Sequence, residues 1–479
     1  MAATSGVGTV VMKFGGTSVA DAEAIGRLLS IVTATIRTLD VPPVVVVSAT
    51  SGTTDQLLAL ASDAQRGADG VDAGVDRVLT RHLDLVNVLT TGERAAALAA
   101  LVTRDLEDLR AVLTAISILR ESSPRSLDAV AAVGEIVSSR IVAAAFEEAN
   151  VPAAWVDARR ALVTNDQHTA ALPLALETRG AVEREIVPHL IEGRVPILGG
   201  FVGSTTSGAT TTLGRGGSDY SAALMGAGVH GLTGPRGARL ECREIQIWTD
   251  VDGMLTADPR VVDAPAVVDR LSFAEASELA YFGAKVLHPS TILPAVSADI
   301  PVRILNSRRP HGEGTRITAE PCSSGRAVAA LACKRRVTVV EITSTRMLMA
   351  HGFLRRLFQV FETYHTPVDV VTTSEVSVSV TVDDDRQLPE IVAALEQFAD
   401  VIVEKDMAIL CAVGDNLTTD PRLAIRLLSA LEGVTLRMVS QAASRRNVTV
   451  VLSDRDVAAA MTRLHEAAFN ATSRLGTAR

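Results

Sequence analysis

The sequence predicts an α/β domain followed by two smaller ferredoxin-like βαββαβ modules. Up to about residue 317, runs of β-branched residues alternate with alanine-rich stretches of helical period, which is typical of strands connected by helices. Beyond that point the segments become shorter, and a βαββα order occurs twice. With 479 residues, 47% of them apolar, the chain is long enough for two or three domains with cores of their own.

This change of pattern sets the expected domain limits. We expect a large domain over residues 1–319, a linker with the stretch EPCSSGR over 320–334, and modules over 335–403 and 404–479. Within the large domain, strands are expected at residues 10–14, 44–48, 195–202 and 245–249. Glycine or hydroxyl residues follow each of them, and loops in this position usually bind ligands in parallel sheets.

Composition narrows the classes of function. The net charge is -9 at pH 7, so we expect no nucleic-acid partner and no anionic membrane surface as partner. The four cysteines lie far apart, without a CxxC pair or histidines at zinc-ligand spacing, so we expect reduced thiols and no metal site. The stretch MAATSGVG lacks a basic region and a long apolar run, which favours a cytoplasmic protein. Small-molecule chemistry is the remaining expectation.

The stretch TVVMKFGGTS, residues 9–18, joins an apolar strand to an anion site. Gly15 and Gly16 let backbone N–H groups approach a phosphate, and the helix that follows favours its negative charge. Lys13 adds a point charge, and Ser18 with Asp21 is placed like a capping box. The lysine precedes the glycines, whereas it follows them in a Walker loop, so this is another phosphate-binding design. Taken alone, these residues suit a glycine turn with a surface lysine equally well.

The stretch TTTLGRGGSDYSAALMG, residues 210–226, surrounds Arg215 with glycines ahead of a helix. We expect Ser218 to cap this helix. Arginine suits bidentate recognition of a carboxylate. Asp219, in the first helical turn, can orient magnesium or the lysine, although an acidic residue there also complements the helix dipole.

Two further stretches suit a metal-bound nucleotide. IWTDVDGMLTADPR, residues 247–260, ends an apolar strand in a loop with several carboxylates and an arginine. A calcium loop is the rival interpretation, but the glutamate expected at the end of an EF-hand loop is missing. In FGAKVLHP, residues 282–289, Lys285 can neutralise phosphate charge, although a single lysine of this kind is more often solvated.

Together with VVSATSGTTD and VGEIVSSR, these motifs occur in the order found in aspartate kinases, and the chain resembles that family over nearly its whole length. The resemblance implies the amino-acid kinase fold, a mainly parallel sheet sandwiched by helices, followed by a regulatory pair of ACT modules. The stretches TTSEVSVSV and RMLMAHGFL are most similar to the lysine-sensitive, monofunctional type.

The resemblance also implies the reaction, which is transfer of the ATP γ-phosphoryl group to the β-carboxylate of L-aspartate. The product is 4-phospho-L-aspartate, on the way to lysine, threonine and methionine. Such chemistry needs positioning and charge neutralisation more than a general base, because the carboxylate is already ionised. Further implied are Mg²⁺ carried by the ATP, lysine as a feedback effector, and a homodimer or higher homo-oligomer formed through the ACT modules.

Residue by residue, the resemblance assigns a role to each motif position. The residues of phosphoryl transfer are Lys13, Asp219 and Arg215. The aspartate pocket consists of Ser48, Thr54, Glu135, Arg215, Gly217 and Ser218, with Glu135 on the substrate ammonium and Arg215 on its α-carboxylate. The nucleotide is held by Lys13, Gly15, Gly16, Thr17, Thr249, Asp250, Arg260 and Lys285. The effector site consists of Met347, Gly352, Leu354, Asp369, Thr373 and Ser374.

The sequence departs from the family pattern in two places. Leu255 stands where many relatives have a tyrosine near the nucleotide, and residues 230–244 are longer than usual, so we expect a surface loop there. Two other functions stay open, namely another carboxylate kinase of the superfamily and a catalytically silent amino-acid sensor built on the ACT modules.

Overall fold

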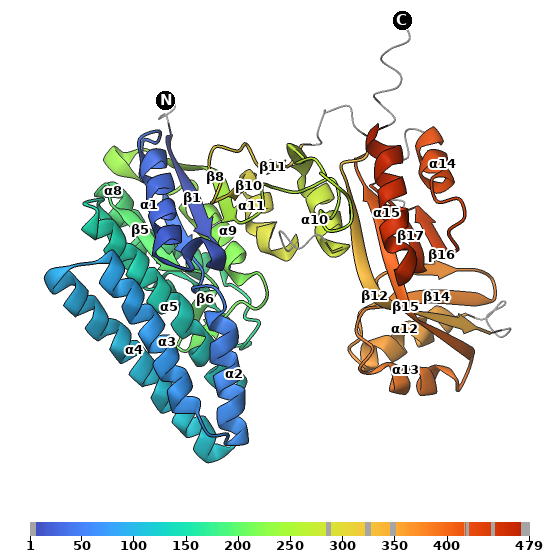
Figure 1. Cartoon of the computed structure of the whole chain (residues 1–479), viewed down its shortest axis with the longest axis horizontal. Helices are drawn as coiled ribbons and strands as arrows, with labels where there is room; N and C mark the ends of the chain where they lie inside the picture. Colours follow the sequence, from blue (N-terminus) through green and yellow to red (C-terminus); the bar gives the residue numbers. More distant parts are fainter. Residues whose placement is uncertain are drawn as a thin grey trace, which may run out of the picture. The chain divides into compact units, whose positions relative to one another are not determined.

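The computed structural model describes residues 6–283, 289–320, 327–344, 351–415, 417, 421–441 and 446–470. Contacts divide the chain into two compact units (Figure 1). Unit 1 comprises Met1–Met254 with Leu287–Glu320, and unit 2 comprises Leu255–Val286 with Pro321–Arg479. Residues 255–286, which the sequence pattern assigns to the large domain, therefore belong to the same unit as the C-terminal modules.

Unit 1 contains the predicted, mainly parallel sheet. Its strand order is β3-β5-β2-β1-β8-β10-β11, in which β11 pairs antiparallel with β10 and the other pairs are parallel. The strands are β1 (Val7–Phe14), β2 (Val44–Val47), β3 (Ala153–Val156), β5 (Val195–Gly199), β8 (Leu240–Thr249), β10 (Val302–Asn306) and β11 (Thr315–Thr318). A small second sheet consists of β4 (Val163–Thr164), β6 (Val202–Thr205) and β7 (Thr210–Thr212).

Helices cover both faces of this parallel sheet, which explains why its strands are apolar throughout. Met12 and Phe14 of β1 pack into one core with the helices α1 to α5. On the other face α9 lies close to β8, since a Cβ added at Gly226 would stand 2.8 Å from the Cδ1 of Ile245. Consequently all four valines of β2 are buried. The helices of unit 1 are α1 (Ala22–Ile36), α2 (Thr53–Arg66), α3 (Val71–Leu89), α4 (Gly92–Leu119), α5 (Pro124–Glu148), α6 (Ala158–Ala161), α7 (Ala175–Glu185), α8 (Val187–Ile191), α9 (Gly217–Val229) and α11 (Leu293–Ser297), with short 3₁₀ turns η1 (Gly16–Val19), η2 (Pro235–Gly237) and η3 (Pro289–Ile292).

The helix α5 is the central helix of the larger core. By length and composition it could cross a membrane, with a mean hydropathy of 1.6 over its most apolar window, but 78% of that window is buried inside the protein. Its apolar residues Val137, Ile141 and Phe146 pack against the sheet and the neighbouring helices. Its hydrophobicity is therefore that of a buried core helix.

Three local expectations are wrong. Asp21, rather than Ser18, caps α1 by accepting a hydrogen bond from the Ala24 backbone, because the chain first makes the 3₁₀ turn η1. The N-cap of α9 is Gly216 with φ of 74°, rather than Ser218. Of the expected loop 230–244, the part from Leu240 onward is the first half of β8, where it pairs with β1 and is held by the sheet.

Unit 2 contains one antiparallel sheet with the order β13-β14-β12-β15-β17-β16. Two long strands pass through both halves of it, and their register shifts between Arg335 and Val339. Leu331 and Leu410 belong to one core and Val340 and Ile342 to another, so the first part of β12 packs with the module that comes later in the chain. The elements of unit 2 are β9 (Arg270–Ser272), α10 (Phe273–Tyr281), β12 (Ala330–Thr343), α12 (Phe353–Thr363), β13 (Val371–Thr373), β14 (Ser377–Val382), α13 (Leu388–Leu395), β15 (Asp400–Val413), α14 (Pro421–Ser429), β16 (Leu436–Gln441), β17 (Asn447–Ser453), η5 (Asp454–Asp456), α15 (Val457–His465) and η6 (Glu466–Asn470).

Residues 255–286 are tied to the later module by hydrogen bonds. The backbone N–H of Leu331 donates to the carbonyl of Thr256 at 2.8 Å, and the Thr256 hydroxyl lies 2.9 Å from His465 Nε2. Farther along, the N–H of Asp415 donates to Glu275 at 2.8 Å. These bonds explain the division of the chain, because the Thr256 carbonyl and the side chains of Thr256 and Glu275 are bonded to residues of the later module.

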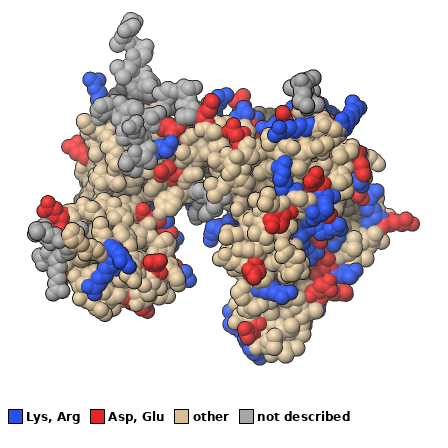
Figure 2. Space-filling model, turned by 180° about the vertical axis from the view of Figure 1, so that it is seen from behind, with Lys and Arg blue, Asp and Glu red and all other residues tan. Residues whose placement is uncertain are grey.

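Basic and acidic side chains are interspersed on the face of the molecule that Figure 2 draws. Where such charges pair on the surface, as Arg110 does with Asp72 and Asp76 at 2.6 Å, each pair contributes less than about 1 kcal/mol. Stability therefore depends mainly on the buried apolar cores.

Leu427→Ala is expected to destabilise the later module of unit 2 by about 2–5 kcal/mol, because this side chain of α14 is 1% exposed and its removal leaves a cavity. Ile425→Ala on the same helix is the control, since Ile425 is 67% exposed, and it should cost less than about 1 kcal/mol. Native-state hydrogen exchange of the β15 and β17 amides measures the stability of this module separately from the rest of the chain. Equal losses of protection in both variants would contradict the assignment of this core.

Candidate active site

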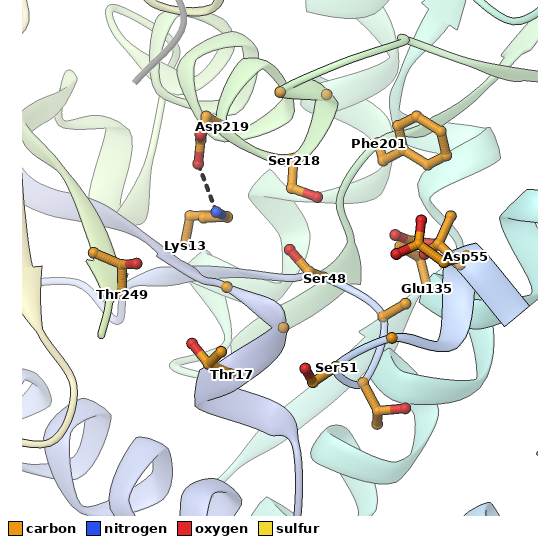
Figure 3. Close-up of a pocket in the computed structure, with 18 of the residues that line it drawn as sticks. Lys13, Thr17, Ser48, Ser51, Asp55, Glu135, Phe201, Ser218, Asp219 and Thr249 are labelled. Atoms are coloured by element: carbon orange, nitrogen blue, oxygen red, sulfur yellow. Dashed lines mark ion pairs between the residues drawn. The ribbon is translucent and has the colours of Figure 1, made fainter. Parts of the chain in front are cut away.

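A pocket of about 500 Å³ lies at the carboxyl edge of the parallel sheet in unit 1 (Figure 3). Residues directly after β1, β2 and β8 line it, together with Phe201 after β5 and the first turn of α9. Parallel strands end at the same edge of a sheet, so motifs far apart in the sequence meet there. The pocket thus forms at the place that the sequence pattern predicts.

An ion pair joins two of these motifs at the pocket. Lys13 Nζ, from the end of β1, lies 2.6 Å from Asp219 Oδ1, from the first turn of α9. Both side chains are mostly buried, with 11% and 14% of their surface exposed. Among the described residues that line the pocket, Lys13 is the single cation, whereas Asp55, Glu135, Asp219 and Asp250 carry carboxylates. The lysine is therefore held in place for an anionic ligand.

The glycines after β1 bring two strand-end loops together. The N–H of Gly15 donates to the carbonyl of Trp248, the last residue but one of β8, at 3.0 Å. A Cβ added at Gly16 would stand 3.0 Å from the carbonyl oxygen of Ala49, after β2. A larger residue at position 16 would push these loops apart, so the glycine is required by this close approach.

A buried hydrogen-bond chain anchors the loop after β2. The hydroxyls of Thr50 and Thr53 lie 2.6 Å apart, and Thr50 Oγ1 lies 3.1 Å from His82 Nε2 on α3. His82 Nδ1 lies 2.7 Å from the carbonyl oxygen of Val78. Burial lowers the pKa of His82 below its usual value, which favours the neutral ring in this chain. The loop 48–54 is thus fixed from behind, while its outer residues line the pocket.

Glu135 of α5 is buried at the base of the pocket, with 4% of its surface exposed. One of its oxygens, Oε2, has no hydrogen-bond partner among the described residues. Burial raises the pKa of this carboxyl to about 8, and the hydrogen bond from the Ala49 backbone opposes that shift only in part. A buried acceptor without a partner calls for a donor from a ligand, and a cationic donor would also restore the ionised form.

Most of the site residues expected from the sequence meet in this pocket. It is lined by Lys13, Gly15, Gly16, Thr17, Ser48, Thr54, Glu135, Gly217, Ser218, Asp219, Thr249 and Asp250. Arg215 is exposed between the lining residues Gly214 and Gly216 and does not itself line the pocket. Arg260 belongs to unit 2, where its guanidinium pairs with Asp258 at 2.6 Å, and Lys285 lies outside the described residues.

Sequence reasoning missed several lining residues, of which Asp55 and Phe201 carry side chains of functional interest. Asp55 lies in the first turn of α2, so its only sequence signal is its place after a strand-end loop. Phe201 has a φ of 66°, which is rare for an aromatic residue and leaves no trace in the sequence pattern.

The expected effector residues lie on two elements of unit 2. Gly352 and Leu354 are at the start of α12, Thr373 ends β13, Ser374 follows it, and Met347 lies outside the described residues. Asp369 is already engaged, because Lys334 Nζ lies 2.9 Å and 2.8 Å from its two carboxylate oxygens. The Tyr281 hydroxyl also donates to it at 2.9 Å. The Asp369 carboxylate is therefore part of an internal ion pair, with 4% of the Asp369 side chain exposed.

The fold and the pocket define a small-molecule kinase of the amino-acid kinase class. A lysine beside paired glycines at the end of the central strand provides a site for phosphate, and a second strand-end loop with a buried carboxylate provides a place for an acceptor. The family model described as the amino acid kinase family matches residues 8–306, and an ACT domain model matches residues 410–468.

The chain belongs to the aspartokinase family. It is 34% identical to lysine-sensitive aspartokinase 3 of Escherichia coli, with 96% of this chain and 99% of that relative covered. It is 36% identical to the chloroplastic aspartokinase 3 of Arabidopsis thaliana, with 96% and 82% covered. The crystal structure of E. coli aspartokinase III with aspartate and ADP matches with a TM-score of 0.82 over 96% of this chain, and the same enzyme with lysine and aspartate matches with 0.78.

Glu135→Gln is expected to change how stability depends on pH. Between pH 4.5 and about 8 the folded protein keeps Glu135 protonated, whereas the unfolded chain has released that proton. The unfolded state binds fewer protons in this window, so the wild type loses stability as pH rises through it, by several kcal/mol in all, and then levels off. The melting temperature of Glu135→Gln minus that of the wild type should therefore grow across the window.

Glu147→Gln is the control for this measurement, because Glu147 lies on the same helix with 49% of its side chain exposed. Its difference from the wild type should stay flat between pH 4.5 and 8. A flat difference for Glu135→Gln as well would show that this carboxyl is ionised in the folded protein.

Proposed function

We propose that this enzyme transfers the γ-phosphoryl group of ATP to the β-carboxylate of L-aspartate, giving 4-phospho-L-aspartate and ADP. The observation that carries the proposal is the meeting of the Lys13–Asp219 pair with the buried Glu135 in one pocket. The first can neutralise a phosphoryl group, and the second can accept hydrogen bonds from the substrate ammonium. The matching E. coli structure is described as a complex with aspartate and ADP, which supports these two ligands.

Each part of the pocket has a proposed task in this reaction. Lys13 stabilises the charge on the moving phosphoryl group, and Asp219 orients the lysine through their ion pair. Backbone N–H groups of Gly16 and Thr17 hold phosphate oxygens beside Gly15, whose own N–H is bonded to the Trp248 carbonyl. Thr249 and Asp250 hold the nucleotide side, and we propose the same role for Arg260 and Lys285. The substrate side consists of Ser48, Thr54, Gly217 and Ser218. Arg215, exposed beside the pocket, binds the α-carboxylate, and no general base is needed.

Magnesium is proposed to arrive bound to the ATP phosphates. Among the residues that the structure describes, there is no group of three or more His, Cys, Asp or Glu side chains that could hold a metal ion. The pocket does present the carboxylates of Asp219 and Asp250, whose charge suits a nucleotide-bound Mg²⁺. The ion would neutralise phosphate charge during transfer.

Lysine is proposed as the feedback effector, through Met347, Gly352, Leu354, Asp369, Thr373 and Ser374. The relative named as lysine-sensitive, and its structure with lysine and aspartate, support this choice. An effector ammonium that uses Asp369 must share that carboxylate with Lys334 or displace it, and Asp383 at 2.8 Å can keep Lys334 paired. The effector inhibits only as far as it prefers the inactive arrangement.

We propose a cytoplasmic enzyme that forms a homodimer or higher homo-oligomer through its ACT modules. Another carboxylate kinase or a silent amino-acid sensor would be revealed by the substrate test. Aspartate should support ADP formation in a coupled assay, whereas glutamate, acetylglutamate and carbamate should not.

Lys13→Ala is expected to lower kcat by roughly 100-fold to 1,000-fold, because one preorganised donor to a developing charge typically contributes that much. The aspartate KM should change only a few-fold, since the lysine acts on the phosphoryl group. Steady-state kinetics of ADP release and circular dichroism of the purified variant provide the measurement. A folded variant with nearly normal turnover would remove Lys13 from the reaction.

Asp369→Asn is expected to weaken inhibition by lysine about ten-fold or more, since a hydrogen bond to a charged group contributes about 1.5–3 kcal/mol. Uninhibited turnover should barely change. Asp384→Asn is the matched control, because Asp384 lies in the same module and pairs on the surface with Arg386. The measurement is a set of dose-response curves of kinase activity with lysine and with threonine for each protein. Inhibition of the wild type by threonine alone would overturn the choice of effector.

A further inference from the structure

A carboxylate that is buried outside the pocket connects three segments of the chain, and these segments lead to the pocket. The Asp128 side chain, in the second turn of α5, is fully buried. His168 Nδ1 lies 2.6 Å from its Oδ2, and the Thr212 hydroxyl donates to its Oδ1 at 2.5 Å. The backbone N–H of Thr169 donates to both oxygens, at 3.0 Å and 3.1 Å. The carboxylate, which α5 carries, is thus satisfied by groups from the loop 165–172 and from β7.

The turn that this carboxylate holds is strained. Thr169 has a φ of 69°, a left-handed conformation that a β-branched residue rarely adopts. Such a conformation persists where the surrounding contacts impose it, and here the bonds from Asp128 to the Thr169 amide do so. The loop closes further through Asn165, whose backbone N–H donates to Leu172 at 2.9 Å.

This turn packs against the glycine loop of the pocket. A Cβ added at Gly214 would stand 3.3 Å from the Thr169 carbonyl oxygen, so backbone meets backbone there. On the other side of the contact, Thr212 is the last residue of β7, and its carbonyl accepts a hydrogen bond from Ala171 at 2.9 Å. The chain then runs directly through Leu213 and Gly214 to Arg215. The hydrogen bonds of Asp128 therefore hold both the start of the glycine loop and the turn at Thr169 against which that loop packs.

We propose that Asp128 and His168 are positioning residues for the glycine loop 213–218, acting through the strained turn at Thr169. Neither side chain lines the pocket, so neither touches the reacting groups. Their action is to hold Arg215 and Ser218 where the α-carboxylate of the substrate is recognised. This step rests on the proposed function, because it takes aspartate as the ligand of that loop.

Asp128→Asn tests the proposal, since an amide keeps the shape but cannot accept from all three donors. The expected result is a rise in the aspartate KM of roughly ten-fold, while the ATP KM stays within about two-fold of the wild type. The substitution removes hydrogen bonds to the Asp128 carboxylate, and this loss affects aspartate binding only by displacing the glycine loop. Hydrogen exchange at the amides of Leu213 and Gly217 should become faster, as their bonds to Phe201 and Gly214 loosen.

Thr169→Gly in the Asp128→Asn background should recover most of the lost aspartate affinity, because glycine adopts the left-handed turn without help. A residue that only stabilises the core would not be rescued in this way. The matched control is Asp105→Asn, which breaks a partly buried pair with Arg140 at 2.9 Å between α4 and α5. It should leave both KM values and the exchange of the glycine loop unchanged.

His168→Leu and His168→Gln provide a second arm in case Asp128→Asn does not fold, because His168 is partly exposed. Leucine should raise the aspartate KM, and glutamine, which keeps a donor, should restore it. The proposal is overturned if a folded Asp128 or His168 variant keeps the aspartate KM and the exchange of the glycine loop within two-fold of the wild type. It is also overturned if both KM values rise together. If the wild type shows no aspartate-dependent activity, the proposed function is wrong. The hydrogen exchange of the glycine loop would still test whether Asp128 and His168 position that loop.

Discussion

The ion pair between Lys13 and Asp219 is the interaction around which the pocket is built. Lys13 ends the central strand β1, and Asp219 lies in the first turn of α9, on the face of the sheet opposite to α1–α5. The two meet only because β1 is held between β2 and β8 and because Gly216 turns the chain into α9. In this mostly buried setting the pairing holds the Lys13 ammonium in one place at the end of β1.

The helix α5 serves the core and the site at the same time. Its apolar residues fill the centre of unit 1, while Glu135 and Asp128 are carboxylates buried along the same helix. Asp128 is fully satisfied by hydrogen bonds, whereas Oε2 of Glu135, a residue that lines the pocket, has no hydrogen-bond partner among the described residues. The first arrangement stabilises local structure, whereas the second costs stability until a ligand supplies the missing donor. Proteins keep such a cost mainly where binding depends on it.

In unit 2 the long strands β12 and β15 give the two modules a common sheet. The early part of β12 packs with the later module, so the later module is not a contiguous stretch of chain. Residues 255–286 also find their hydrogen-bond partners there, including Thr256 and Glu275. Arg260, one of the expected nucleotide residues, is therefore part of the same compact unit as the ACT modules.

The sequence by itself determined the class of fold and most of the pocket. Apolar runs such as those of β1 and β2 mark buried parallel strands, and the glycines at 15–16 and 214–217 mark the turns beside which Lys13 and Asp219 lie. These features are local, since periodicity and turn chemistry are written in neighbouring residues. The strand character of Leu240 onward and the engagement of Asp369 by Lys334 were decided by tertiary structure. In both cases the partner comes from elsewhere in the chain, and no local pattern encodes the burial or the charge that a distant segment brings.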